Sequence, residues 1–425
     1  MRLYYPVRVV EHAERIPAAG PVIFVLNHPN GLLDPIVLRI ASGRPVRFLA
    51  KSTLFDNPFG RAAMQAFGTI PIYRAHESGG RAGDASRNDA SFALCRAELA
   101  KGGAIALFPE GASHSDPVMR DLKTGAARIA LSAAAERQGG ITIIPVGLHF
   151  ERKETFRSRV LLVVGEAAPV APMLAAYARD ERAAVNELTA VIRARLDDVV
   201  LQAGTKELLE GVALVAAWTS ADGNANDAAA VNRRARELAA AYQRMNERDP
   251  ARVEQVAAGA RAYARMLRRL GIRNPWAVEL EPVRGSIVAW YALRLLVYSP
   301  FAVIGAILGW IPYRFAGWLA ARKAGSDDVL GTAKLLAGLL FVGGAWIVES
   351  IAAGVLFGAV WSVPTFLVAA ATGYLALRFQ ELAGDAAEWA RAVWLRARHG
   401  ATIDRLTARR RQLAGEVADT LREIQ

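Results

Sequence analysis

The sequence predicts an α/β domain with a largely parallel sheet flanked by helices, followed by an α-helical region with C-terminal membrane helices. Three observations predict this fold class. Residues 20–170 alternate short apolar runs with helical patterns, residues 171–275 are rich in Ala, Arg, Glu and Leu, and the last third contains long uncharged stretches. Strands separated by helices are typical of parallel sheets. A bilayer crossing needs about 20 apolar residues in succession.

The strands of the α/β domain are predicted from short apolar runs bounded by turn residues. The first run, Val22–Leu26, is rich in β-branched residues and lies between Gly20-Pro21 and Pro29, as expected of a buried strand. The other predicted strands are Val46–Leu49, Thr69–Ile72, Ala104–Phe108, Thr142–Val146 and Val160–Val164. Helical patterns occur at 35–41, 58–67, 88–101 and 120–138.

The chain after residue 170 changes from amphipathic to apolar and back. Residues 171–285 read as amphipathic helices, with a linker at residues 220–227, "SADGNAND". Residues 286–379 are predicted to be membrane-embedded. Residues 380–425 return to an Arg-rich amphipathic pattern, suited to lying on a membrane or packing on another helix.

Two uncharged stretches define the membrane segment. Leu295 to Ile311 gives 17 uncharged residues, and Leu335 to Leu377 gives 43 with Glu349 as the sole charge. The longer stretch suffices for two helices. Its expected bend is Val360–Pro364, where Trp and Pro suggest an interface.

The shorter stretch, within 286–320, admits two interpretations. Arg294 interrupts it, and Pro300 and Pro312 divide it. A single crossing here would place the basic loop that follows on the side opposite the N-terminal domain, against the positive-inside tendency. A re-entrant or interfacial element followed by one hairpin is therefore slightly favoured over three crossings.

Glu349 also has two interpretations in this segment. It either pairs with Arg294 or Lys334 within the membrane, or lies near a helix end and reaches the headgroups.

Charge and hydropathy point to a membrane rather than to nucleic acid. The chain of 425 residues has 52 Lys and Arg against 40 Asp and Glu, a formal net charge of +12 and a pI of about 10.1. This balance suits an anionic surface, and mean hydropathy is +0.19 with 53% hydrophobic residues. No zinc-finger spacing or RNA-binding motif occurs, so no nucleic-acid partner is expected.

The single cysteine and the N-terminal segment add two expectations. Cys95 has no partner for an intrachain disulfide and lies in an apolar helical stripe, so it is predicted to be a core residue. Arg8, Glu11 and Arg15 interrupt the N-terminal segment where a signal peptide needs an apolar run, so no cleaved signal is expected.

Polar residues follow four of the predicted strands. The four stretches are "NHPNGLLD" (27–34), "GTIPIYR" (68–74), "LFPEGASHS" (107–115) and "IIPVGLHF" (143–150). Carboxyl ends of parallel strands meet at one edge of the sheet, where α/β proteins bind ligands, so one shared pocket is predicted. Taken alone, the first stretch has a simpler interpretation: His28 satisfied at a strand exit, Asp34 an N-cap, and Asn30-Gly31 a turn.

Together and in this order, the four stretches resemble the glycerophospholipid acyltransferase superfamily over residues 1–170. Five residues separate His28 from Asp34 where the common block has four, and Ala112-Ser113-His114 stands where many members have Thr-Arg. These departures, with "GTIPIYRA", "LKTGAARIAL" and "FRSRVLLVVGE", look like the fungal-type glycerol-3-phosphate and dihydroxyacetone-phosphate acyltransferases. The resemblance makes residues 1–170 the expected catalytic domain.

The chemistry of acyl transfer suits His28 and Asp34 as catalytic residues. A neutral imidazole, with a pKa of roughly 6.5, is a suitable base for an acceptor hydroxyl that attacks a thioester carbonyl. Asp34 would hold the tautomer and stabilise the imidazolium, as the acid does in a Ser-His-Asp triad. No Gly-x-Ser-x-Gly elbow occurs in this domain, so an acyl-serine intermediate is not expected.

The predicted substrate-binding residues surround this pair in the sequence blocks. Arg74 is the expected phosphate ligand, because a guanidinium binds phosphate through two parallel hydrogen bonds. Glu110 would accept from an acceptor hydroxyl or orient Arg74, with an N-cap or an ion pair as the alternative. The full predicted set is Asn30, Lys51, Arg74, Glu110, Gly111, Ser113 and Lys123. His114 and His149 lack metal-site spacing, so no metal is expected.

The resemblance implies a membrane-bound O-acyltransferase that acylates glycerol-3-phosphate from an acyl-CoA or acyl-carrier-protein thioester. The alternative within this class is lysophosphatidate as acceptor, and the alternative outside it is a non-catalytic lipid-binding scaffold. No cofactor beyond the thioester co-substrate is implied. The expected partners are the thioester carrier, a glycerol-phosphate acceptor and anionic lipid, at the cytoplasmic face of the inner (plasma) membrane.

Overall fold

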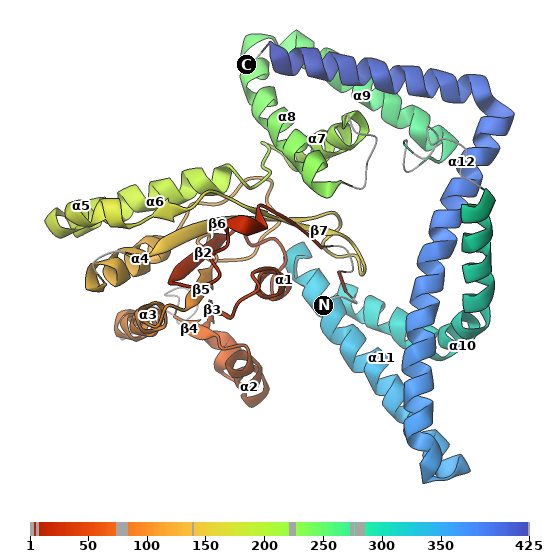
Figure 1. Cartoon of the computed structure of the whole chain (residues 1–425), viewed down its shortest axis with the longest axis horizontal. Helices are drawn as coiled ribbons and strands as arrows, with labels where there is room; N and C mark the ends of the chain where they lie inside the picture. The colour runs from red at the N-terminus through yellow and green to blue at the C-terminus, as the bar shows by residue number, and fades with distance from the viewer. Residues whose placement is uncertain are drawn as a thin grey trace. The chain divides into compact units, whose positions relative to one another are not determined.

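The structure is a computed structural model, and it describes residues 4–5, 8–73, 84–137, 140–220, 227–272, 276 and 285–423 (Figure 1). The chain forms two compact units. The first comprises Met1–Leu209 with Ser326–Thr332, and the second comprises Glu210–Gly325 with Ala333–Gln425. Each unit is described by itself below.

The first unit is built on an eight-stranded sheet with the order β1-β7-β6-β2-β5-β3-β4, and β8 pairs with β6. Its strands are β1 (Arg8–Glu11), β2 (Val22–Leu26), β3 (Val46–Lys51), β4 (Ile70–Ile72), β5 (Ala104–Leu107), β6 (Thr142–Phe150), β7 (Val160–Val164) and β8 (Ala168–Pro169). Strands β2 to β6 are parallel to one another, whereas β7 is antiparallel to β6. The prediction of a largely parallel sheet is therefore confirmed.

Strand β2 lies at the centre of this sheet, hydrogen-bonded to β5 on one side and β6 on the other. All five of its residues are buried, which explains its unbroken apolar sequence, since a parallel strand is covered on both faces. Strand β1 was not predicted because this short edge strand begins with Arg8, ends with Glu11 and has no buried residue. Strand β6 continues to Phe150, past its predicted end at Val146.

Helices flank the sheet. The first unit contains α1 (Leu33–Ala41), α2 (Pro58–Ala66), α3 (Asp84–Ala100), α4 (Gly125–Glu136), α5 (Leu174–Arg179) and α6 (Glu181–Asp197). Helices α4 and α6 contact β2, and α6 also contacts β6 through a face that buries Leu188 and Ile192. This packing explains why the compact unit extends past residue 170 to Leu209. Cys95 in α3 is fully buried, as predicted, and burial raises the pKa of its thiol to about 12.

The second unit is helical. Its helices are α7 (Lys206–Thr219, from Glu210 on), α8 (Ala228–Arg248), α9 (Pro250–Leu270), α10 (Gly285–Lys323), α11 (Asp327–Phe357, from Ala333 on) and α12 (Ser362–Arg422). Trp218, Tyr263 and Leu267 pack with Leu406 and Leu413 of α12 in one apolar cluster. The linker expected at 220–227 lies, for residues 221–226, outside the described part of the chain.

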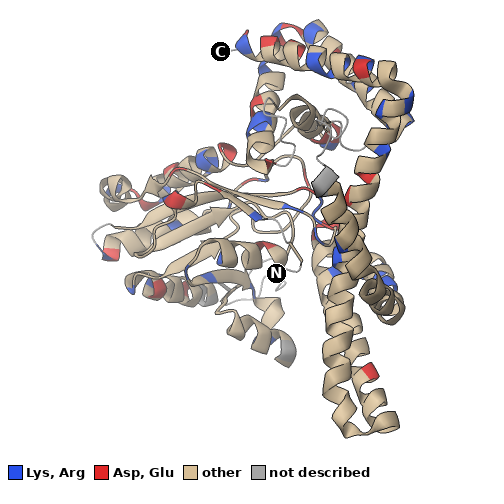
Figure 2. Cartoon of the chain, turned by 45° about the vertical axis from the view of Figure 1, so that its right-hand side comes forward, with Lys and Arg blue, Asp and Glu red and all other residues tan. Residues whose placement is uncertain are grey.

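Helix α12 includes the end of the predicted membrane segment (286–379) and most of the predicted C-terminal basic segment (380–425). It runs through residue 380, the expected start of the C-terminal basic helices, and its backbone leaves the helical region at His399. Figure 2 shows few charges on α10, on α11 and on the first part of α12, and many more on α8, α9 and the end of α12. The change in charge falls within the part of α12 that precedes the kink at His399.

Among the described residues, three helices are long and apolar enough to cross a membrane: residues 288–323, 327–357 and a window within 359–422. Pro300 and Pro312 do not divide the first of them, because both lie inside the single helix α10. The expected division at these prolines is therefore wrong, whereas the choice between a re-entrant or interfacial element and a third crossing stays a prediction. A proline removes one backbone donor from a helix, and membrane helices tolerate this loss where neighbouring groups compensate.

The bend and the acidic residue of the apolar segment also have defined positions. Helix α11 ends at Phe357, a short 3-10 turn covers Ala359–Trp361, and α12 begins at Ser362, so the break overlaps the expected bend at Val360–Pro364 but begins and ends earlier. Within the described residues, the buried Oε2 atom of Glu349 has no hydrogen-bond partner. The pairing considered with Arg294 or Lys334 is thus not formed there.

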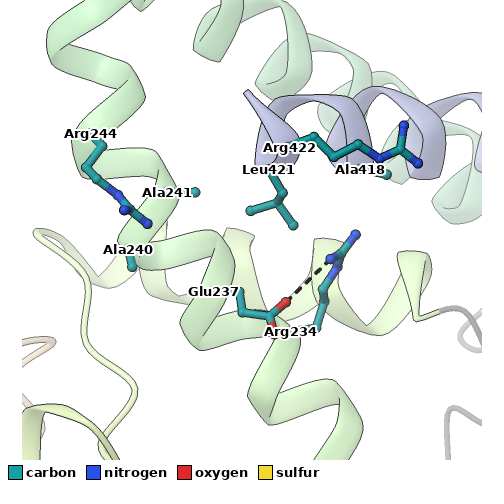
Figure 3. Close-up of a pocket in the computed structure, with 8 residues that line it drawn as sticks. All are labelled: Arg234, Glu237, Ala240, Ala241, Arg244, Ala418, Leu421 and Arg422. Atoms are coloured by element: carbon teal, nitrogen blue, oxygen red, sulfur yellow. Dashed lines mark hydrogen bonds and ion pairs between the residues drawn. The ribbon is translucent and has the colours of Figure 1, made fainter. Parts of the chain in front are cut away.

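Helix α8 and the end of α12 flank a groove of about 390 Å³ in the second unit. Figure 3 shows the three arginines that line it, Arg234, Arg244 and Arg422, with Arg234 paired to Glu237 at 3.4 Å. Arg422 is also paired, to Asp419 at 3.0 Å, so two of the three guanidinium groups that line the groove have an acidic partner.

The buried Arg410 should contribute more to stability than its exposed neighbour. Its Nη1 donates to the Trp218 carbonyl at 3.2 Å, and its guanidinium lies 3.8 Å from the ring centre of Trp276. Arg410→Ala should destabilise the protein by roughly 2 kcal/mol, since a cation–π contact and a hydrogen bond are lost. Thermal unfolding in detergent measures this, with the exposed Arg411→Ala as control. Equal unfolding temperatures for the two variants would contradict the assignment.

Candidate active site

The chain just after the central strand β2 is held by the side chain of Asn27, which extends the hydrogen bonding between β2 and β6. Asn27 follows the last residue of β2, and its Nδ2 donates to the Leu148 carbonyl at 3.1 Å while its Oδ1 accepts from the Leu148 N–H at 2.7 Å. The amide thus takes the place of a backbone pair between β2 and β6. The next residue, His28, leaves the sheet at a defined position.

His28 is hydrogen-bonded to Asp34. The distance from His28 Nδ1 to Asp34 Oδ2 is 2.8 Å, and the same oxygen accepts from the Asn30 N–H at 2.8 Å. The chain returns through a turn in which the Leu33 N–H donates to the Asn30 carbonyl at 3.0 Å. Asp34 is not an N-cap, because that position belongs to Leu32. The simpler interpretation of Asp34 is therefore replaced by a His–Asp pair.

The environments of the two partners differ. Asp34 is fully buried, and burial raises the pKa of its carboxyl above the ordinary value of 3.8, although the bonds from His28 and Asn30 act in the opposite direction. The His28 side chain is 16% exposed. Its ring stacks on Phe108 with centroids 3.8 Å apart and planes within 10°. With Nδ1 bonded to Asp34, Nε2 is the ring nitrogen left to meet a substrate.

The "FPEG" stretch forms a turn beside His28. The Gly111 N–H donates to the Phe108 carbonyl at 3.0 Å, and Gly111 has φ of +83°, a region that glycine adopts without strain. The Lys123 N–H donates to the Pro109 carbonyl at 2.7 Å. The His114 N–H donates to the His28 carbonyl at 3.1 Å, so this loop and the His–Asp loop are held together.

Glu110 lies inside this loop and is 5% exposed. Its Oε2 contacts His114 Nε2 and accepts from the Arg120 N–H at 2.8 Å. Its Oε1 is buried without a hydrogen-bond partner among the described residues. The structure therefore shows the ion-pair arrangement for Glu110, and its role toward an acceptor hydroxyl stays a prediction.

Two residues that were predicted to bind substrate make hydrogen bonds to other residues of the protein instead. Asn30 is fully buried, and its Nδ2 donates to Tyr5 Oη at 2.9 Å and to the Lys153 carbonyl at 3.0 Å. Ser113 Oγ donates to Asp328 Oδ2. Asn30 thus stabilises the loop between His28 and Asp34 through buried hydrogen bonds.

The predicted basic residues are spread along the edge. Lys123 is exposed and lies against Gly111, where an added Cβ would be 3.4 Å from its Cγ. Lys51 ends β3, two strands from β2 and so about 10 Å away. Arg74, after the edge strand β4, lies outside the described residues. The structure brings together His28, Asp34, Asn30, Glu110, Gly111, Ser113 and Lys123.

Lys153 belongs to the site and was not predicted. Its Nζ donates to the Pro29 carbonyl at 3.3 Å and contacts Ser115 Oγ, which joins the His–Asp loop to the "FPEG" loop. Burial lowers the pKa of its ammonium group, and nearby carboxylates of Asp327 and Asp328 oppose this. The rule that found the other loops, polar residues after a strand end, finds Lys153 once β6 is extended to Phe150.

The residues with metal-ligand chemistry do not gather into a metal site. Across the part of the chain that the structure describes, no three His, Cys, Asp or Glu side chains are placed to hold a metal ion. Whether the protein uses any cofactor stays a prediction. The chemistry that this site offers is that of a positioned base beside a turn of backbone amides and two ammonium groups.

Comparisons with known proteins agree with this chemistry. Residues 7–149 match the family model described as Acyltransferase. An uncharacterized acyltransferase from Schizosaccharomyces pombe is 28% identical over 77% of this chain and 53% of its own length. Glycerol-3-phosphate O-acyltransferase 2 from Saccharomyces cerevisiae is 42% identical over 15% of this chain and 9% of its own length. A 1-acyl-sn-glycerol-3-phosphate acyltransferase from Chlamydomonas reinhardtii is 28% identical over 34% of this chain and 39% of its own length.

The first unit thus carries an acyltransferase domain. These comparisons support the resemblance of residues 1–170 to the glycerophospholipid acyltransferase superfamily. The chain spans about half the length of the S. pombe relative and less of the others. Among solved structures, the 1-acyl-sn-glycerophosphate acyltransferase PlsC from Thermotoga maritima aligns with a TM-score of 0.31 and 21% identity, over 45% of this chain and 72% of that one.

Replacing Asp34 by Asn should separate activity from stability. Asn cannot hold the proton on Nδ1 of His28, so turnover should fall roughly 10⁴-fold, as when the acid of a catalytic triad is replaced. Because burial raises the pKa of Asp34 in the fold, folded protein binds more protons than unfolded protein above pH 3.8, and stability falls as pH rises. The unfolding temperature of Asp34→Asn should therefore rise relative to that of wild type as pH increases. A constant difference from acid to neutral pH would contradict this.

Proposed function

We propose that this protein is a membrane-bound O-acyltransferase that transfers a fatty acyl group from a coenzyme A or acyl-carrier-protein thioester to glycerol-3-phosphate. The single observation that carries the proposal is the His28–Asp34 pair at the carboxyl edge of the sheet, with Nε2 left for a substrate. A protein that only binds lipid has no need for a base and an orienting acid at hydrogen-bond distance.

His28 acts as the base in this reaction. Nε2 removes the proton from the acceptor hydroxyl as its oxygen forms a bond to the thioester carbonyl carbon. Collapse of the tetrahedral intermediate breaks the carbon–sulfur bond, and the thiolate that leaves takes the proton from the imidazolium. Asp34 keeps the proton on Nδ1 throughout and balances the imidazolium charge. Stacking on Phe108 keeps the ring in one plane.

The acceptor phosphate is bound by the basic residues of the same edge. Lys153 and Lys123 supply ammonium groups, and Arg74 is the predicted bidentate ligand. Two relatives from S. cerevisiae are named as glycerol-3-phosphate O-acyltransferases, which supports this acceptor. The C. reinhardtii relative carries the name of a 1-acyl-sn-glycerol-3-phosphate acyltransferase, which makes lysophosphatidate the second candidate.

The membrane location is proposed from the second unit. Its three candidate spans expose large apolar side chains such as Ile307, Leu339 and Val363, and contiguous exposed apolar surface of this extent requires a lipid or protein cover. The chain carries a formal net charge of +12, which favours the cytoplasmic leaflet with its anionic lipids. Acceptor and thioester are water-soluble, whereas the acylated product belongs in the bilayer.

Acyl transfer by the purified protein in lipid tests the proposal. Glycerol-3-phosphate and lysophosphatidate are offered separately with labelled acyl-CoA or labelled acyl-carrier protein, and the products are separated by chromatography. Wild type should convert glycerol-3-phosphate to lysophosphatidate, and His28→Ala should lower turnover by at least 10²-fold, because general-base catalysis is lost. The exposed histidine variant His12→Ala is the matched control and should keep full activity.

Each other outcome has a defined meaning. Phosphatidate formed only from lysophosphatidate would keep the mechanism and change the acceptor. Full activity of His28→Ala would overturn the assigned base. No transfer to either acceptor from either donor, by protein that still binds lipid vesicles, would favour a non-catalytic scaffold.

A further inference from the structure

The start of α11 together with the residue before it, Ser326–Thr332 (called the turn below), belongs to the same compact unit as the active site, although the rest of that helix does not. Two hydrogen bonds join this turn to the N-terminal part of the chain. The Leu32 N–H donates to Thr332 Oγ1 at 3.2 Å, and Tyr4 Oη donates to the Gly331 carbonyl at 3.0 Å. Leu32 lies inside the loop that runs from His28 to Asp34, so the contact is with the catalytic loop itself.

Gly331 packs against this loop so closely that a side chain does not fit. A Cβ at this position would lie 2.6 Å from Asn30 Oδ1, 2.9 Å from the Lys153 carbonyl oxygen and 3.1 Å from Leu33 Cδ1. Asn30 cannot move aside freely, because its Nδ2 is bonded to Tyr5 Oη and to the same Lys153 carbonyl. The backbone N–H of Asn30 is the donor that holds Asp34 Oδ2. A displacement of Asn30 therefore reaches the catalytic acid directly.

The same turn also contacts the second loop of the site. Asp328 Oδ2 accepts from Ser113 Oγ, and the neighbouring His114 N–H is bonded to the His28 carbonyl. One helical turn thus touches both loops that carry the predicted catalytic and binding residues. None of its own side chains has a place in the acyl-transfer chemistry described above.

We propose that Gly331 and Thr332 are positioning residues for the His28–Asp34 pair, supplied by the helix whose remainder is a candidate membrane span. Thr332 fixes the loop at Leu32, and Gly331 allows the helix to approach Asn30. The site is then incomplete until this turn is in place. The inference rests on the proposed function, because its principal readout is acyl transfer.

Two glycine variants on the same helix form a matched pair. Gly331→Ala should lower kcat on the order of 10²-fold, because a shift of about 1 Å in a catalytic group has that effect. The KM for the acyl thioester should stay unchanged, since the loop and not the donor site moves. Gly338→Ala is the control, because within the described residues nothing lies within 4 Å of an added Cβ there. Equal kcat for both variants would overturn the role of Gly331.

Thr332 gives a second test that does not depend on a steric clash. Thr332→Val has the same shape but no acceptor for the Leu32 N–H, and kcat should fall about tenfold for the lost hydrogen bond. Thr332→Ser restores the hydroxyl and should restore kcat, which a merely structural role in packing would not produce. Unchanged kcat in Thr332→Val would overturn the role of Thr332.

Hydrogen–deuterium exchange of the full-length protein in detergent separates this inference from the proposed function. Amides of residues 30–34 should exchange faster in Thr332→Val than in wild type or Thr332→Ser. If wild type transfers no acyl group, the proposed function fails, and exchange alone then decides whether the turn holds the loop. Identical exchange in all three proteins would refute the contact itself.

Discussion

The site depends on one hydrogen bond, from His28 Nδ1 to a carboxylate that has no contact with solvent. A buried carboxylate is unfavourable unless it is hydrogen-bonded, and Asp34 has two donors on one oxygen and none on the other among the described residues. The fold therefore keeps an incompletely satisfied acid where a neutral side chain would cost less. Such a cost is expected where a side chain is retained for its chemistry rather than for stability.

The sheet topology explains how this bond is formed by residues that lie in one short loop. Strand β2 is central, and its neighbours β5 and β6 run in the same direction, so the loops after all three meet at one edge. The loop after β5 supplies Phe108 against the ring of His28, and the loop after β6 supplies Lys153. Asn27 joins β2 to β6 at the last possible residue. The position of His28 is thus set by contacts with residues of the neighbouring strands and loops on both sides of β2.

The sequence was sufficient for the parts of this arrangement that depend on local pattern. The boundaries of β2 and β7 are as predicted, because both strands lie inside the sheet, are buried along their whole length and are continuous apolar runs. The pairing of His28 with Asp34 was expected from the four ordered stretches and the family resemblance that they carry, because the first stretch alone also admitted an N-cap role for Asp34. The sequence was not sufficient for Tyr5, Asn30 as a buried support, or Asp328, because these contacts join segments far apart in the chain. Likewise Pro300 and Pro312 indicate a break that the helix does not show, since tertiary packing overrides local preference.

The contact between Leu32 and Thr332 joins residues 300 positions apart. Closing a flexible loop of that length costs roughly 5 kcal/mol by the logarithmic dependence on length. Three hydrogen bonds, from Leu32, Tyr4 and Ser113, contribute on the order of 1 kcal/mol each, which does not offset this cost alone. However, Glu210–Gly325 and Ala333–Gln425 fold into one compact unit, so the intervening chain is not a flexible loop when both units are folded. With residues 210–325 ordered in this way, completing the catalytic loop through Thr332, as proposed, costs less entropy than closing a flexible loop of the same length.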